Sequence, residues 1–142
     1  MGRNLRSAKA AGSRFERLIA DHLDDRLEGC HVDRQVKTGA ADSGDLYGVT
    51  CRGRQIAIEC KNVTKMGLPQ WVREAHTEAS NIGGLTGVVI HKRHGNAQAG
   101  DQWVTMTVTD LITILNHANR KAPTECPPRQ LQPTSSSSTS PT

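Results

Sequence analysis

Aromatic residues are scarce in this sequence, and long apolar runs are absent from it. Phe, Trp and Tyr make up 3% of the 142 residues, so a hydrophobic core has to be built mainly from Leu, Ile, Val and Ala. No apolar run approaches the roughly 20 residues that a membrane-spanning helix needs. The basic N-terminus also lacks the apolar stretch of a secretory signal. We therefore expect a protein that neither crosses a membrane nor is secreted.

Paired cysteines are lacking too. Four Cys residues are present, but none of them forms the Cys-x-x-Cys pair that is typical of a zinc site. Their number and spacing do not indicate the disulfide framework of a small secreted domain either. This pattern favours a reducing compartment, and we expect a cytoplasmic location.

Acidic side chains are missing from the first 14 residues, which carry four basic ones. Residues 15–33 have six acidic and two basic side chains, whereas residues 34–93 have nine basic and five acidic ones. A basic arm together with a basic middle region suits a polyanion such as nucleic acid. The charge alone leaves open a second interpretation, in which a pI near 9.1 simply favours solubility.

One folded domain is expected between two segments without regular structure. Residues 122–142 are rich in Pro, Ser and Thr and nearly free of apolar side chains, which is typical of disorder. Residues 1–6 are expected to form a flexible basic arm. The folded domain then comprises residues 7–121, which is long enough for one hydrophobic core.

Hydrophobic periodicity predicts the elements of this domain. Apolar residues spaced three and four apart indicate a first helix with Ser7 as its N-cap and Gly29 as its stop. Pro69 can open a second helix, which the glycines at 83–84 end. Apolar runs bounded by turn residues indicate strands. The predicted strands cover residues 31–36, 45–51, 54–63, 86–92 and 102–108.

A last helix is expected to begin at a cap residue, Thr109, and to turn an apolar face towards the core. The residues of that face are Leu111, Ile112, Ile114 and Leu115. The order of elements is then α-β-β-β-α-β-β-α. This order predicts a single α/β domain with a mixed central sheet flanked by helices.

The predicted strand 54–63 carries the most informative residues. Side chains alternate between the two faces of a strand, so Ile56, Ile58 and Cys60 share one face, which we assign to the core. Glu59 and Lys61 then share the opposite face. An acid and a lysine two residues apart are common by chance, and alone they fit a solvated charge ladder as well as a functional site.

A hairpin with the preceding strand strengthens the functional interpretation. If the turn is centred on Gly53, Asp45 lies opposite Lys61 and Tyr47 lies opposite Glu59, and opposed residues share a sheet face. Asp45, Glu59 and Lys61 would then meet at one end of the hairpin. A register shift of one residue would place Asp45 on the other face.

Two carboxylates beside a lysine suit phosphodiester hydrolysis. Mg²⁺ binds through one or two carboxylates plus waters and phosphate oxygens, and it lowers the pKa of a bound water. Lys61 can orient the attacking water and stabilise the charge that develops on the phosphate. Glu16, on the margin of the first helix, can complete the metal shell. Asp42 is a rival of Asp45, but Asp45 opens a strand whereas Asp42 lies in a loop.

The loop over residues 34–44 leads directly into Asp45, and its glycines permit close approach of the backbone to a ligand. Its basic and hydroxyl side chains can contact phosphates, although an ordinary flexible connection explains each of them equally well. The residues that we expect to contact DNA, here and elsewhere, are Arg3, Arg6, Arg14, Arg34, Lys37, Ser43, Lys65 and Gln70.

Three short motifs together resemble the PD-(D/E)XK nuclease superfamily. They are Gly12-x-x-x-Glu16 on a helix, Gly44-Asp45-Leu46 at the start of a strand, and Ile58-Glu59-Cys60-Lys61 on the next strand. The short chain and the basic loop with Gly and Ser before Asp45 are most similar to Holliday junction resolvases of the archaeal and phage type. The resemblance covers roughly residues 7–115. No Pro precedes Asp45, a departure that the superfamily tolerates.

This resemblance implies a restriction-endonuclease-like fold and a Mg²⁺-dependent endonuclease, with Mn²⁺ as a substitute ion. It also implies a homodimer that cuts branched DNA symmetrically, in a cytoplasm of phage or bacterial type. By the match, Asp45 and Glu59 would bind the metal, Glu16 would support it, and Lys61 would act at the nucleophile. Gln70 stands where many members carry a polar site residue, but a Gln there can also cap the helix or face solvent.

The sequence leaves two other functions open. A nuclease of the same fold can act in repair, restriction or as an exonuclease, and the same scaffold can bind DNA without turnover. Replacing Glu59 or Lys61 by Ala separates an enzyme from a binding module, because only an enzyme loses its activity.

Overall fold

The computed structural model describes residues 4–36 and 42–120 of the chain. The tail expected over residues 122–142, together with Arg3 and Lys37, lies outside the described residues. The elements in chain order are α1 (Leu5–Arg26), β1 (Asp33–Arg34), β2 (Leu46–Tyr47), β3 (Thr50–Cys51), β4 (Arg54–Lys61), α2 (Leu68–Asn81), β5 (Thr86–His91), the short 3-10 helix η1 (Ala99–Asp101), β6 (Trp103–Thr105) and α3 (Val108–Asn119). The predicted order is confirmed, except that the strand expected over 45–51 is divided into β2 and β3.

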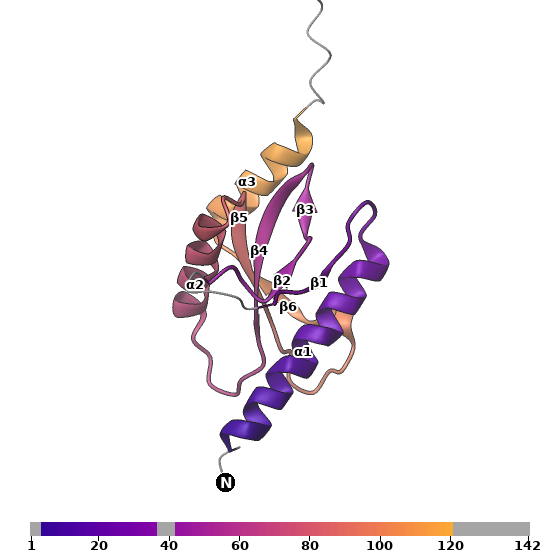
Figure 1. The fold of residues 1–142 in the computed structure, drawn as a ribbon. Helices are drawn as coiled ribbons and strands as arrows, with labels where there is room; N and C mark the ends of the chain where they lie inside the picture. Colours follow the sequence, from indigo (N-terminus) through magenta and orange to yellow (C-terminus); the bar gives the residue numbers. More distant parts are fainter. Residues whose placement is uncertain (1–3, 37–41, 121–142) are drawn as a thin grey trace, which may run out of the picture.

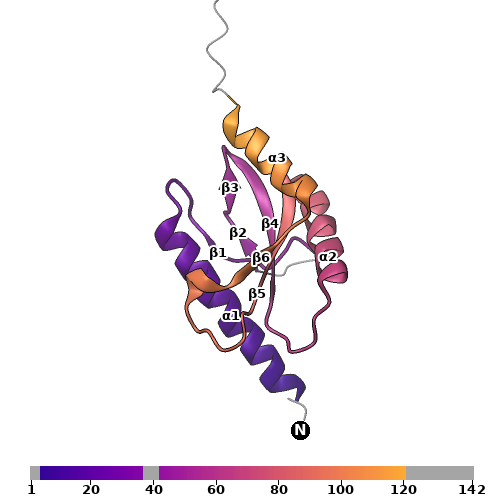
Figure 2. The same ribbon diagram turned by 180° about the vertical axis from the view of Figure 1, so that it is seen from behind.

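The strands form one mixed sheet in the order β1-β2-β4-β5-β6, with β3 paired to β4. β4 and β5 are parallel, joined by the crossover helix α2, and the other pairs are antiparallel. Helices α1 and α2 flank the sheet on opposite sides, and α3 lies near the end where β3 and β4 meet (Figure 1, and Figure 2 from behind). The expected α/β class, with helices around a mixed sheet, is therefore confirmed.

Each face of the sheet carries its own apolar cluster. Under α1, Phe15 and Ile19 pack against Leu46, Ile58 and further aliphatic side chains of β4 and β5. Under α2, Trp71 and Ala75 pack against Val89 of β5. This second contact is close, because a Cβ on Gly87 of β5 would lie 2.0 Å from the backbone oxygen of Ala75. Only glycine allows α2 to pack this tightly over β4 and β5.

The first helix begins earlier than the sequence predicts. Asn4, not Ser7, is its N-cap, and the Asn4 side chain accepts a hydrogen bond from the backbone N–H of Ser7 at 2.9 Å. Leu5 and Arg6, which we assigned to a flexible arm, lie in the first helical turn. The helix ends at Arg26, three residues before Gly29. Asn is as good a cap as Ser, so the sequence alone did not separate the two positions.

The hairpin turn also differs from the prediction. Cys51 pairs with Arg54, so the turn has two central residues, Arg52 and Gly53, and is not centred on Gly53 alone. Both have positive φ, 49° and 81°, as a type I′ turn requires. A regular ladder continued from this turn would place Asp45 opposite Cys60, on the core face.

A second irregularity, at Gly48, returns Asp45 to the face of the sheet that carries Glu59. Gly48 has φ 89°, and a Cβ there would lie 1.9 Å from the backbone oxygen of His31, so no other residue fits. The chain inserts one extra residue here, and Leu46 pairs with Ile58. Asp45 therefore stands next to Glu59, and the predicted pairs Asp45–Lys61 and Tyr47–Glu59 are wrong. The shared face of Asp45 and Glu59 nevertheless holds, because the two departures together shift the register by two residues.

The last helix corrects two further predictions. Thr107, not Thr109, is the N-cap of α3, and it forms a reciprocal capping box with Asp110. Asp110 is buried and also accepts hydrogen bonds from Thr86 and from His76 of α2, which ties α3 to the rest of the fold. Only Ile114 of the expected inward face packs against the core. Leu111, Ile112 and Leu115 are exposed, because α3 lies over the end of the sheet and not across its face.

Within residues 4–36 and 42–120, no helix has both the length and the apolar character needed to cross a membrane.

Candidate functional site

Three carboxylates lie together in the space between the sheet and α2. Asp45 precedes β2, Glu59 belongs to β4 and Glu78 belongs to α2; their exposed fractions are only 7%, 8% and 2%. The backbone places Asp45 firmly, since its N–H donates to the oxygen of Ile58 at 2.9 Å. Three acids in so little space repel one another unless protons or a cation neutralise them.

A proton on Glu78 can relieve this repulsion. Burial raises its pKa to about 10, and a hydrogen bond to Glu59 and the negative charges of Glu59, Asp42 and Asp45 act in the same direction. A hydrogen bond between two carboxyls requires a proton on one of them, and the raised pKa places it on Glu78. The Oε2 atom of Glu78 is buried without a hydrogen-bond partner. This oxygen could therefore accept a further hydrogen bond or contact a cation.

Lys61 supplies the cation of the cluster. Its Nζ lies 2.8 Å from Oε1 of Glu59 and 2.8 Å from Oε2 of Glu74, which is on α2 one turn before Glu78. Burial of Lys61 opposes its charge, but the hydrogen bonds to the two glutamates outweigh this effect and raise its pKa. The same contact with Lys61 lowers the pKa of Glu74. Lys61 is therefore a fixed ammonium at the end of β4.

The strand end orients Asp45 through the backbone. Oδ2 of Asp45 accepts a hydrogen bond from the N–H of Cys60 at 2.7 Å. Burial, followed by the charges of nearby carboxylates, raises the pKa of the Cys60 thiol. The acids that contribute are Asp45, Glu16, Glu59 and Glu78. These four acids therefore gather around the end of β4 from both faces of the sheet.

Glu16 reaches this region from α1, but its carboxylate has a partner of its own. Oε2 of Glu16 accepts from Nε of Arg34 at 3.0 Å and lies 2.9 Å from Nη2 of the same side chain. Arg34, which we expected to contact DNA, is thus paired with Glu16 in this structure. Glu16 and Glu78 occupy opposite sides of the sheet, and Glu78 is the acid that joins Glu59 directly.

The other predicted site residues lie around this centre. Gln70 is exposed and donates to Glu74 at 3.2 Å, so it is linked to Lys61 through one glutamate. Asp42 is exposed; its side chain accepts from the N–H of Gly44, and its charge contributes to the raised pKa of Glu78. Ser43 is half-buried in the same loop. A surface pocket of about 310 Å³ opens beside the acids, lined by Asp42, Gln70, Arg73, Glu74, Thr77 and Glu78.

The expected basic contacts are distributed along one end of the molecule. Arg6 and Arg14 are exposed on α1, and Lys65 is exposed in the loop between β4 and α2. That loop and the start of α1 lie at the same end of the fold, at the bottom of Figure 1.

A metal ion is the alternative to a proton for neutralising these acids. In the part of the chain that the structure describes, no group of three or more His, Cys, Asp or Glu side chains is arranged as a metal site. The chemistry of the acids nevertheless fits a hard divalent ion: Asp45 and Glu59 offer carboxylate oxygens, and Glu78 holds an unpartnered buried oxygen. A divalent ion would replace the proton on Glu78 as the neutralising charge.

Glu78 and Glu74 are the site residues that the sequence prediction missed. From the sequence, the apolar stripe of this helix is expected to comprise Val72, Ala75, His76, Ala79 and Ile82. The structure confirms Ala75 and Ala79 as buried, but the other buried residues are Trp71 and Glu78. Glu78 therefore lies in the middle of the true buried face. An acid that follows the helical spacing of buried apolar residues is the signal that could have identified Glu78, since a buried acid needs a specific partner.

Comparisons with known proteins do not add to this description. No protein-family model, no curated protein and no solved structure matches the chain significantly.

Proposed function

We propose that this protein is a Mg²⁺-dependent endonuclease that hydrolyses phosphodiester bonds of branched DNA, such as a four-way junction. One observation carries the proposal: Asp45 and Glu59 stand side by side, buried, at the end of the central strand β4, and Lys61 contacts Glu59 at 2.8 Å. The arrangement of two acids and a lysine on one sheet face is the one that the PD-(D/E)XK resemblance implies. The mixed sheet flanked by helices supports a restriction-endonuclease-like fold.

Each residue has a role that follows from its position. Asp45 and Glu59 would hold the metal, because they are the acids that the backbone fixes on the sheet. When bound, Mg²⁺ makes hydroxide available near neutral pH and neutralises charge on the phosphate. Lys61 would orient the attacking water and stabilise the developing phosphate charge. Glu16, paired with Arg34, would stabilise the end of β4 on the α1 side, where its negative charge contributes to the raised pKa of Cys60.

The decisive experiment compares a synthetic four-way junction with a linear duplex of the same sequence, with Mg²⁺, with Mn²⁺ and with EDTA. We expect paired cuts in the junction with either ion and none with EDTA. Equal cutting of both substrates would contradict the junction specificity and indicate a nuclease with another target. Junction binding without cutting under all conditions would contradict the enzyme and indicate a binding module.

The proposal includes a homodimer, because symmetric cutting of two strands requires two active sites. The surface that we assign to it combines the edge strand β6 with the exposed face of α3. Among the described strands, β6 pairs with β5 alone, which leaves backbone groups available to a second copy. The exposed apolar residues are Trp103 and Val104 on β6, and Val108, Leu111, Ile112 and Leu115 on α3. Exposed apolar side chains that gather on one surface are typical of interfaces.

Placing charges on this surface is expected to separate the subunits. The double substitution Ile112→Glu and Leu115→Glu should weaken dimerisation by about 30-fold or more, since each residue would bury a charge in an apolar interface. The measurement is mass by light scattering across a dilution series, and Arg26→Glu, with the same change in net charge at the far end of α1, is the control. A wild-type protein that stays monomeric at high micromolar concentration would contradict the assignment.

A further inference from the structure

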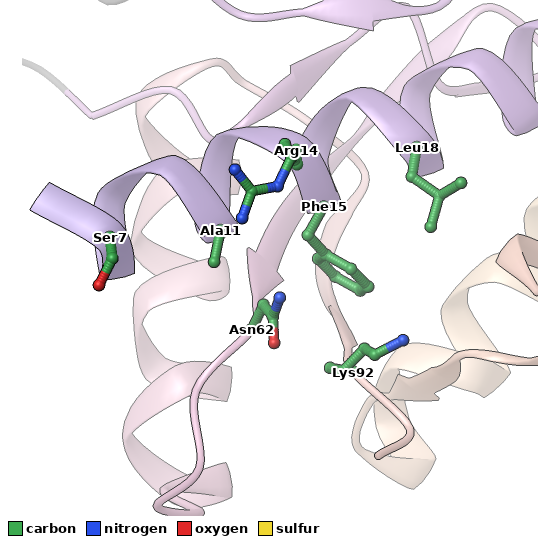
Figure 3. A pocket seen from close by; sticks show the side chains of 7 residues that line it. All are labelled: Ser7, Ala11, Arg14, Phe15, Leu18, Asn62 and Lys92. Atoms are coloured by element: carbon green, nitrogen blue, oxygen red, sulfur yellow. The ribbon is translucent and has the colours of Figure 1, made fainter. Parts of the chain in front are cut away.

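A second pocket lies on the opposite side of the sheet from the carboxylates, between α1 and the ends of β4 and β5. Its volume is about 340 Å³, which is within the range of pockets that hold one small ligand. The residues that line it are Ser7, Ala11, Arg14, Phe15, Leu18, Asn62 and Lys92. Figure 3 shows Arg14 on the helix, with Asn62 and Lys92 below it at the two strand ends; the amino group of Lys92 extends towards the side of Phe15 and Leu18.

The chemistry of the lining is that of a phosphate-bearing ligand. Arg14 and Lys92 are both cationic, and the lining contains no acid. The Nζ of Lys92 donates to the backbone oxygen of Asn96, and an ammonium has three donors, so two remain for a ligand. Asn62 and Ser7 add neutral donors. Phe15, together with Ala11 and Leu18, gives the pocket an apolar wall for a sugar or base.

The position of the pocket relates it to the proposed active site. Asn62 follows Lys61 directly, and the backbone N–H of Lys92 donates to the oxygen of Lys61 at 2.9 Å. Alternation along the strand directs Lys61 towards α2 and Asn62 towards α1. Consecutive Cα atoms are about 3.8 Å apart. Lys61 and this pocket therefore lie at the same end of β4, on opposite faces of the sheet, so a DNA strand would reach both by crossing that end.

We propose that this pocket binds one unpaired nucleotide of the DNA strand next to the bond that is cut, with its phosphate between Arg14 and Lys92. A pocket of this size, bounded by α1, admits a single nucleotide but not the grooves of a duplex. The inference rests on the proposed DNA-cleaving function and names the part of the substrate that it recognises: a strand that is unpaired beside the branch.

Equilibrium binding in EDTA tests the pocket without any contribution from catalysis. The probes are a fluorescein-labelled duplex with a single-stranded arm and a fully paired duplex of equal length, titrated at several salt concentrations. For Arg14→Ala combined with Lys92→Ala, we expect at least about 10-fold weaker binding of the arm-bearing probe. For the same probe, we expect the slope of log binding constant against log salt concentration to decrease in magnitude by roughly 1–2, with a smaller change for the paired duplex. Arg26→Ala combined with Arg120→Ala is the control with the same charge loss at exposed remote positions.

A neutral variant separates pocket binding from general surface charge. Asn62→Leu keeps the net charge, and we expect it to weaken binding of the arm-bearing probe several-fold with an unchanged salt slope. Equal losses on both probes, or no loss in either pocket variant, would overturn the inference. Because EDTA prevents cutting in every arm, this result is independent of whether the wild-type protein cleaves a junction with Mg²⁺.

Discussion

Replacing Lys61 by methionine is expected to reduce junction cleavage by about 100- to 1,000-fold while junction binding stays within about threefold of wild type. The reason is that Lys61 is a preorganised ammonium, held between Glu59 and Glu74 at 2.8 Å from each. Losing one such group from a site where charge develops in the transition state typically reduces the rate by this amount. Methionine keeps most of the apolar stem, so local packing is retained.

The measurement is single-turnover cleavage of a labelled junction with saturating Mg²⁺, together with binding of the same junction in Ca²⁺. Glu59→Gln replaces the charged partner of Lys61 by a neutral side chain of the same shape. We expect it to reduce the cleavage rate by at least about 100-fold. Glu28→Gln, in the exposed segment after α1, is the matched control for Glu59→Gln and should cut at the wild-type rate. Cleavage by the Lys61 variant within threefold of wild type would contradict the role of Lys61.

A second large effect is expected at Glu78, where stability and activity should change in opposite directions. Glu78→Gln removes the need to bury a carboxyl among Asp45 and Glu59, so the metal-free protein should gain about 1–4 kcal/mol of unfolding free energy near pH 8. The same change removes a carboxylate next to the proposed metal ligands. We therefore expect cleavage at a fixed, limiting Mg²⁺ concentration to fall by about 10- to 100-fold.

The pH dependence follows from the sign of the pKa shift. The folded protein raises the pKa of Glu78 from 4.5 to about 10. Between these values the folded state binds more protons than the unfolded state, so stability decreases as pH rises. The contribution of Glu78 is complete below pH 4.5 and is lost as the pH approaches 10. Urea unfolding in EDTA at pH 6 and pH 9 should show this loss for wild type and much less of it for Glu78→Gln.

Glu28→Gln again serves as the control, since an exposed carboxyl should leave the pH profile of stability unchanged. An identical decrease in stability from pH 6 to pH 9 in wild type and in Glu78→Gln would contradict the assignment of the buried proton to Glu78. A variant that loses stability at both pH values would show that the carboxyl is an essential hydrogen-bonding group and not a strained acid.

Local pattern determined most of the elements of this protein. The apolar residues of α1 and the alternation in β4 depend on neighbours within a few positions, and those neighbours fix a period of 3.6 or 2. For that reason the sequence alone placed Ile58 in the core and Glu59 with Lys61 on the other face. The order of helices and strands and the mixed sheet also follow from these local periods and from chain connectivity.

Tertiary structure decided what depends on contacts between distant segments. The register beside Asp45 is set at Gly48, where the backbone of His31 leaves no room for a side chain, and no local pattern records that contact. The membership of Glu78 in the acidic cluster depends on how closely α2 packs on the sheet. The exposure of Leu115 depends on where α3 lies. Spacing along the chain fixes which residues share a face, but only packing between elements fixes which faces meet, because that choice is made by shape and burial across the whole fold.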